Sequence, residues 1–314
     1  QLEAILRERP TNERALFVLG GIKRQLDKLE EAAAHFETVL KINPKFELAY
    51  YELAGVRLFQ NKPTITLATL KKAGEQFKPR FITKFYAGLA HSALYQYPKA
   101  IENLLDAEKL AQAGEQNRLT HFFYFQLGAA YERNRQYETS DETFNKAIEM
   151  APEYHNAMNY LGYMWADINR NLDEAAKHIT KANELSPDNA SYVDSLGWLY
   201  FRQGKFTEAL AELQRAAELM KDEPDSTIHE HIGDTHQQLG QADEARAQWE
   251  KSLGLLHKQE AEMTSPDSYL LEQLGNVLNK LGQADEAKAA WQRSYDITPT
   301  QLLHKKLHPP EKEE

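Results

Sequence analysis

Residues 239–252 read LGQADEARAQWEKS, and residues 281–294 read LGQADEAKAAWQRS. The two segments agree at most positions, and the second begins 42 residues after the first. A near-duplicate at this separation indicates a repeated structural unit. Weaker copies of the same unit occur upstream, which makes the repeat the starting point for predicting the fold.

The upstream copies are aligned by a small residue that follows an aliphatic one. Successive copies are separated by 34, 34, 40, 34, 35, 36 and 42 residues. The aligned pairs are Leu19-Gly20, Leu53-Ala54, Ala87-Gly88, Leu127-Gly128, Leu161-Gly162, Leu196-Gly197, Ile232-Gly233 and Leu274-Gly275.

Each unit also has a second small residue, followed by a large apolar one. Twelve residues after the first small residue come, in order, Ala32, Thr66, Ala100, Ser140, Ala175, Ala209, Ala245 and Ala287. Four residues later come Phe36, Leu70, Leu104, Phe144, Ile179, Leu213, Trp249 and Trp291. This spacing predicts two amphipathic helices per unit that cross closely at the small residues. Prolines such as Pro44 and Pro152 stand near the unit ends, where they prevent the second helix from continuing.

The pattern resembles the tetratricopeptide repeat family, whose unit is a 34-residue helix–turn–helix. The resemblance covers residues 13–301. It implies an all-α fold, a right-handed α-solenoid of about eight units with a concave groove. The predicted units begin at Glu13, Glu47, Phe81, His121, His155, Ala190, Ser226 and Ser268. We expect residues 1–12 to be the end of a truncated upstream repeat and residues 302–314 to form a short capping helix and a charged tail.

The composition narrows the classes of partner. Hydrophobic residues make up 42% and charged residues 27%, as in ordinary core-forming proteins. The net charge of −10 argues against nucleic acid, whose phosphates require a basic surface. Apolar runs stay shorter than the roughly 18 residues of a membrane-spanning helix, so we expect no membrane insertion by this segment. The chain has no cysteine, which excludes disulfide chemistry but leaves the compartment open.

The sequence shows no arrangement typical of an enzyme. His229, His231 and His236 are the densest histidine cluster, but side chains two or five residues apart do not share a helix face. The segment 197–206 resembles a phosphate-binding loop only superficially, and Gly204 fits a turn between two helices better. We therefore predict no catalytic residues, no metal site and no cofactor.

In the resembled family the first helix of each unit lines the groove. Its second, fifth, ninth, twelfth and thirteenth residues point inward. By that resemblance, the peptide-binding groove is predicted to include Phe17, Tyr51, Phe85, Leu89, Phe122, Phe125, Asn156, Asn159, Tyr163, Asp194, Trp198 and Phe201. This groove is apolar and aromatic in the first four units, mixed in the next two, and acidic and polar in the last two.

Aromatic residues at helical spacing usually belong to a core, so the segment HFFYF (121–125) has to be divided. We predict that Phe123 and Tyr124 pack between helices. Phe122 and Phe125 are expected to face the groove, because contiguous exposed apolar surface usually marks a binding site.

These observations predict a non-enzymatic adaptor or scaffold that binds a protein or an extended peptide. Residues 159–216 are similar to a bacterial group that includes outer-membrane lipoproteins acting as adaptors for periplasmic C-terminal-processing proteases. The similarity implies a bacterial envelope adaptor, periplasmic or outer-membrane-anchored rather than cytoplasmic, with a protease or its substrate as partner. Two alternatives stay open, a helical targeting domain of a larger enzyme and a scaffold that forms homo-oligomers.

Overall fold

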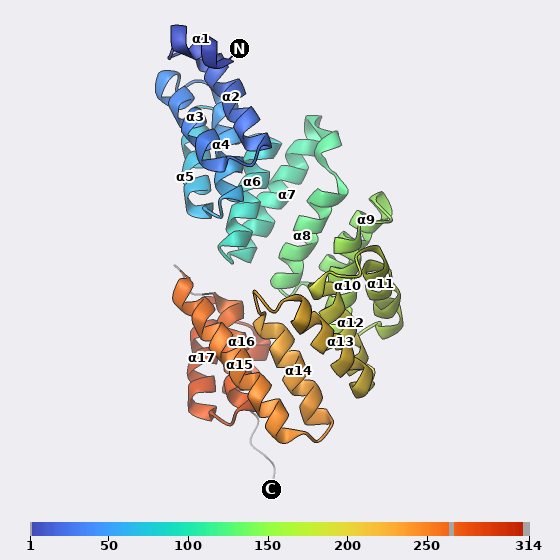
Figure 1. Cartoon of the computed structure of the whole chain (residues 1–314). Coiled ribbons are helices and arrows are strands. Elements are labelled where there is room, and N and C mark those ends of the chain that lie inside the picture. The colour runs from blue at the N-terminus through green and yellow to red at the C-terminus, as the bar shows by residue number, and fades with distance from the viewer. Residues whose placement is uncertain (1, 264–266, 310–314) are drawn as a thin grey trace. The chain divides into compact units, whose positions relative to one another are not determined.

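The computed structural model describes residues 2–263 and 267–309, and all regular structure within them is helical (Figure 1). This confirms the predicted all-α fold. The chain forms two compact units, Gln1–Thr143 and Phe144–Glu314. The boundary between them falls inside α9 (Tyr137–Met150), whereas the sequence predicted one continuous array over residues 13–301.

The N-terminal unit consists of helix pairs joined by short turns, coloured blue to green in Figure 1. Its helices before α9 are α1 (Leu2–Glu8), α2 (Glu13–Gln25), α3 (Leu29–Ile42), α4 (Glu47–Phe59), α5 (Pro63–Gly74), α6 (Phe81–Ala93), α7 (Tyr97–Gly114), the 3₁₀ helix η1 (Gln116–Arg118) and α8 (His121–Arg133).

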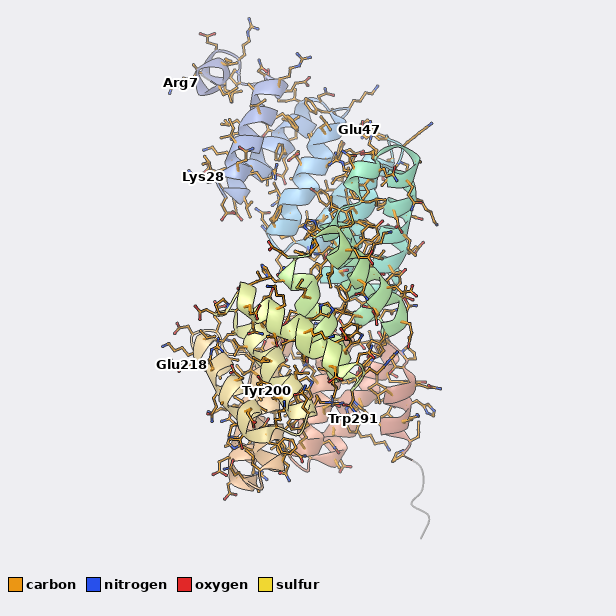
Figure 2. The ribbon with its side chains drawn as sticks, turned by 90° about the vertical axis from the view of Figure 1, so that its right-hand side faces the viewer. Arg7, Lys28, Glu47, Tyr200, Glu218 and Trp291 are labelled. Carbon is orange, nitrogen blue, oxygen red and sulfur yellow. The ribbon has the colours of Figure 1, made fainter. Side chains whose placement is uncertain are left out.

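The C-terminal unit repeats the same arrangement, and side chains such as Glu218 extend outward from it (Figure 2). Its helices after α9 are α10 (His155–Asp167), α11 (Leu172–Leu185), α12 (Ala190–Arg202), α13 (Phe206–Leu219), α14 (Ser226–Gln238), α15 (Ala242–Glu262), α16 (Ser268–Lys280), α17 (Ala284–Ile297) and α18 (Gln301–Leu307).

The eight residues predicted to begin a unit are each the first residue of a helix. The preceding residue explains several of these starts. The side chains of Asn12, Thr120, Asn189, Asp225 and Asp267 accept hydrogen bonds from backbone N–H groups in the first turn. Such caps satisfy donors that have no partner inside the helix.

Within each repeat, the two helices meet at the small residues that align the copies in the sequence. A Cβ atom added to Gly197 would lie 2.7 Å from Leu213 Cγ, and one added to Gly162 would lie 2.7 Å from Ile179 Cγ1. Leu213 and Ile179 are fully buried. At these two crossings the close approach therefore requires glycine in the first helix, and a large apolar side chain of the second helix fills the space.

In two repeats, the small residue of the second helix carries a hydroxyl group. Ser140 Oγ donates to the carbonyl oxygen of Gly128 at 2.9 Å, and Thr66 Oγ1 donates to that of Ala54 at 3.3 Å. Both hydroxyl groups are buried and hydrogen-bonded, so they fit the crossing without the cost of an unpaired polar atom.

The turn between the two helices of each repeat has a residue with positive φ at the same position. Gly204, Gly240 and Gly282 have φ values of 76°, 75° and 79°. At the same turn position the earlier units have positive φ at Asp27, Asn61, Tyr95, Arg135 and Asn169. Gly204 is thus a turn residue, as predicted, and glycine fits this left-handed position with the least strain.

The last described helix, α18, covers one side of α17. Leu303 and Leu307 are buried, and Lys306 Nζ reaches Glu272 Oε1 at 2.8 Å and Asn276 Oδ1 at 2.7 Å on α16. These contacts are the ones a capping helix would make. Residues 310–314 of the predicted charged tail lie outside the described residues.

Candidate protein-binding surface

The predicted groove residues lie on the first helix of each helix pair. Within each compact unit successive first helices contact each other, as α4 does α6 and α10 does α12. We call the side of each unit formed by these helices the first-helix face.

Most fifth-position residues of the first helices are buried between neighbours rather than exposed. Phe85 and Phe125 are each 8% exposed, Asn159 is 5% exposed, and Tyr51 and Asp194 are similarly covered. Their side chains therefore contact the neighbouring helix. The expectation that they form an open surface has to be revised, since the contact between successive first helices uses these positions.

In the N-terminal unit the predicted aromatic residues form a packed cluster. The rings of Phe81 and Phe85 stack at 5.3 Å, and Phe85 lies 5.9 Å from Phe123 and 6.2 Å from Phe122. Phe122 remains 43% exposed. Phe123 and Tyr124 are core residues, as predicted, while the burial of Phe125 contradicts its predicted exposure.

Phe17 and Leu89 are half-buried in the same unit. The Phe17 ring lies 4.9 Å from Phe46 and 5.6 Å from Phe36, and the Tyr51 hydroxyl donates to Glu47 Oε1 at 2.8 Å. Phe17 and Tyr51 thus already contact side chains of their own unit, so these two predicted positions offer little free surface.

In the C-terminal unit three predicted residues come together on neighbouring first helices. Trp198 stacks on Phe201 at 4.6 Å and on His231 at 4.0 Å, and the Tyr163 ring lies 6.3 Å from His231. Tyr163 and Phe201 are half-exposed. His231 is not among the residues predicted from the sequence to line the groove. It is the sixth residue of its first helix, and its side chain points to the preceding helix.

His231 is held by a buried carboxylate. Its Nδ1 atom lies 2.9 Å from Asp194 Oδ1, and both side chains are less than a tenth exposed. Burial alone would lower the pKa of His231. The charge and hydrogen bond of Asp194, with Glu230 and Asp234 nearby, outweigh burial and raise the pKa of His231 above its usual value.

Two buried polar atoms beside this stack have no hydrogen-bond partner. They are Asn159 Oδ1 and Trp198 Nε1. Buried polar atoms are nearly always hydrogen-bonded, and leaving one unpaired costs about 1–3 kcal/mol. Asn159 Oδ1 is an acceptor on α10, and Trp198 Nε1 is a donor on α12, the next first helix.

Asn156 is also at a predicted position and is half-exposed, but its side chain is already hydrogen-bonded. Its Oδ1 atom accepts a hydrogen bond from the Tyr192 hydroxyl, which also lies 2.7 Å from His155 Nδ1. Burial raises the pKa of Tyr192 to about 12, so this hydroxyl remains protonated and able to donate at neutral pH.

The predicted acidic end of the groove is largely neutralised by lysines. Lys280 Nζ lies 2.7 Å from both Glu230 Oε1 and Asp234 Oδ2, and Asp234 Oδ1 also accepts from Trp249 Nε1 at 3.0 Å. Burial would lower the pKa of Lys280, but the two carboxylates raise it, so the ammonium group is stable. We conclude that these acidic residues hold successive helices together.

The three clustered histidines have separate partners. His229 Nδ1 lies 2.8 Å from Gln248 Oε1 and His236 Nδ1 lies 2.6 Å from Gln241 Oε1, while His231 pairs with Asp194. Over residues 2–263 and 267–309, no group of three histidines or carboxylates is placed to hold a metal ion. No helix in the described part of the chain is long and apolar enough to cross a membrane.

The helix pairs match a known repeat family. A tetratricopeptide repeat model matches residues 125–190 and 195–254, and a second model of the same repeat matches residues 13–46. Together the matched segments span just over half of the chain. The chain is a tetratricopeptide repeat protein.

Two relatives are similar to part of this tetratricopeptide repeat protein. A TPR repeat-containing protein of Pseudomonas aeruginosa is 37% identical over 87 residues, which is 28% of this chain and 14% of the relative. Anaphase-promoting complex subunit 3 of Schizosaccharomyces pombe is 32% identical over 98 residues, 31% of this chain and 15% of that protein. The alignments thus span only a small fraction of either relative.

Among solved structures, the crystal structure of the APC/C hetero-tetramer Cut9-Hcn1 is similar with a TM-score of 0.56 and 13% identity. It covers 89% of this chain and 52% of that chain. At this identity the similarity shows the repeat fold alone.

Proposed function

We propose that this protein is a non-enzymatic adaptor that binds an extended peptide segment of a partner protein. The binding site is the first-helix face of α10, α12 and α14. One observation carries the proposal, the unpaired atoms Asn159 Oδ1 and Trp198 Nε1 next to the half-exposed rings of Tyr163 and Phe201.

A peptide supplies what these atoms lack. Asn159 Oδ1 accepts a hydrogen bond and Trp198 Nε1 donates one, while each peptide group offers an N–H and a C=O. Tyr163 and Phe201 supply large contact areas for the peptide's side chains. Because neighbouring side chains cover the two unpaired atoms, the peptide contacts the two rings first and reaches the atoms after a side-chain rotation.

A location in a bacterial envelope, with a protease or its substrate as partner, is a further part of the proposal. It is supported by the resemblance of residues 159–216 to bacterial adaptors. Cell fractionation of the native protein tests it, and recovery in the cytoplasm alone would contradict it.

Peptides selected from a random library on the immobilised chain test the peptide site. We expect Tyr163→Ala and Phe201→Ala each to lower the affinity for the selected peptides about tenfold, equivalent to about 1.4 kcal/mol. The matched control is Tyr200→Ala, an aromatic deletion next to Phe201 in α12 whose ring lies beside Lys205. Equal affinity for all three variants and the unchanged chain would contradict the proposed site.

A further inference from the structure

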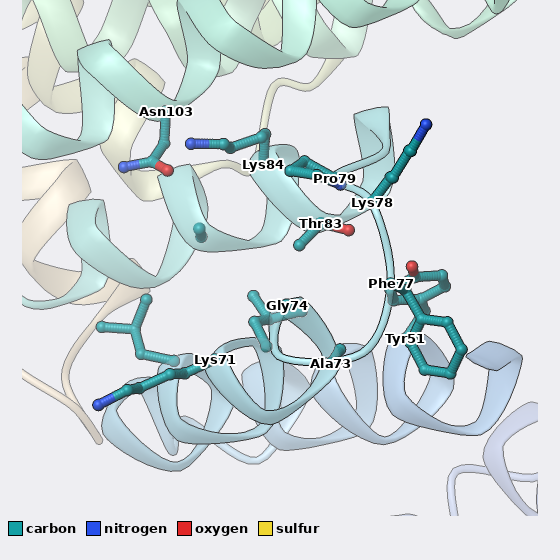
Figure 3. Close-up of a pocket in the computed structure, with 13 residues that line it drawn as sticks. Tyr51, Lys71, Ala73, Gly74, Phe77, Lys78, Pro79, Thr83, Lys84 and Asn103 are labelled. Carbon is teal, nitrogen blue, oxygen red and sulfur yellow. The ribbon is translucent and has the colours of Figure 1, made fainter. Parts of the chain in front are cut away.

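A pocket of about 250 Å³ opens in the N-terminal unit between α5 and α6 (Figure 3). Its apolar lining comes mainly from Leu67, Leu70, Phe77 and Ala87. Small-molecule sites usually enclose about 300–1,000 Å³. A pocket below that range accommodates a single apolar side chain rather than a whole cofactor.

Positive charge surrounds this pocket in an otherwise acidic chain. Residues 71–84 contain four lysines and one arginine but a single carboxylate, Glu75, while the whole chain has a net charge of −10. Three of the lysines, Lys71, Lys78 and Lys84, line the pocket. Such a local reversal of charge indicates an anionic ligand.

The lysines differ in how far they are already paired. Lys84 Nζ lies 2.9 Å from Asp106 Oδ2, so its charge is shared with that carboxylate. Lys71 and Lys78 have no ion pair among the described residues and are exposed. Figure 3 shows Lys84 and Asn103 together on one side of the pocket and Lys71 across from them on the α5 side, all toward the same end, whereas Lys78 lies at the other end and points away. Lys71 is thus the main unpaired cation at that end.

We infer that this pocket binds an acidic peptide segment of a partner protein. One apolar side chain of the peptide enters between α5 and α6. One flanking carboxylate pairs with Lys71, and the other accepts a hydrogen bond from the amide of Asn103 on the opposite side of the pocket. This site is separate from the peptide site on α10–α14, so either can exist without the other.

The chain offers a blocking variant with a matched control. Gly74 lines the pocket at the end of α5, and a Cβ atom added there meets no heavy atom within 4 Å. Gly114 ends α7 in the same way with equally open surroundings, and it does not line the pocket. We expect Gly74→Leu to obstruct the pocket without disturbing the fold, whereas Gly114→Leu makes the same change elsewhere.

The test is fluorescence anisotropy of the labelled pentapeptide Ser-Asp-Phe-Asp-Ser titrated with the full chain. We expect saturable binding that weakens about tenfold in Gly74→Leu and in Lys71→Gln. Gly114→Leu and Lys72→Gln should bind as the unchanged chain does, since Lys72 is exposed but does not line the pocket. Equal binding by Gly74→Leu and Gly114→Leu would overturn the inference.

Two altered probes separate this site from general attraction between opposite charges. Ser-Asp-Ala-Asp-Ser lacks the apolar anchor and Ser-Asn-Phe-Asn-Ser lacks the charges, and each should bind at least tenfold more weakly. Undiminished binding of the alanine probe, or no measurable binding of the original pentapeptide, would show that the pocket does not recognise an anchored acidic peptide.

Discussion

Gly197 shows how one missing side chain fixes the crossing of two helices. An added Cβ atom would approach Leu213 Cγ to 2.7 Å, and it would also lie 3.1 Å from the backbone nitrogen of Leu213. We expect Gly197→Ala to destabilise the C-terminal unit by about 1–3 kcal/mol, as overpacking does in other cores. Urea unfolding followed by circular dichroism measures the change.

The matched control for Gly197→Ala is Gly254→Ala. Gly254 lies within α15 and has nothing within 4 Å of an added Cβ atom. This replacement should stabilise the helix, by up to about 1 kcal/mol, because alanine has the higher helix propensity. Similar effects of the two replacements would contradict the close crossing at Gly197.

A pH dependence follows from the His231–Asp194 pair. The pKa of His231 is raised in the folded chain above its unfolded value. Its contribution to stability is therefore fully present below about pH 6.5 and is lost as the pH rises through the raised pKa. Thermal unfolding from mildly acidic to mildly alkaline pH measures this. The melting temperature of the unchanged chain should exceed that of His231→Gln by an amount that decreases as the pH rises. A constant difference between the two would contradict this assignment.

Residue by residue, the sequence predicted contacts within a helix pair better than contacts between pairs. The crossing at Gly162 and Ile179 recurs at the same spacing in other units, so its signal adds up along the chain. Burial of Phe125 depends instead on how far one first helix is rotated against the next. That rotation leaves no periodic signal, and neither does the pairing of His231 with Asp194, 37 residues away.

At the level of elements, α18 provides the sharpest stability test. Leu303 is fully buried and its neighbour Leu302 is 43% exposed. We expect Leu303→Ala to cost about 2–3 kcal/mol, at the low end for buried leucines because the helix is short and terminal. Leu302→Ala should change the free energy of unfolding by less than about 0.5 kcal/mol. Chemical denaturation distinguishes them, and equal costs would contradict the packing of α18 on α17.

The helix starts were predictable because local signals mark them. Asn189 and Asp225 cap the helices that follow, and the repeat spacing places each start independently of the caps. The division of the chain inside α9 was not predictable, because the repeat pattern continues through Phe144 without interruption.

Over the whole molecule the two units differ in the chemistry of their first-helix faces. In the N-terminal unit the predicted residues form an aromatic cluster around Phe85. In the C-terminal unit a stack of rings meets paired carboxylates, with Asn159 Oδ1 and Trp198 Nε1 left unpaired. The residue types along the chain predicted this difference in the chemistry of the two faces. They did not predict the unpaired atoms, because these depend on three-dimensional packing.

Photo-crosslinking tests the proposed peptide site most directly. A peptide is selected from a random library on the Gly74→Leu chain, in which the pocket of the N-terminal unit is filled, and is then resynthesised with a photoreactive phenylalanine. Mass spectrometry maps the attachment points. We expect attachment to α10, α12 and α14, near Tyr163 and Phe201. Attachment confined to the second helices α11 and α13, or to the N-terminal unit, would contradict it.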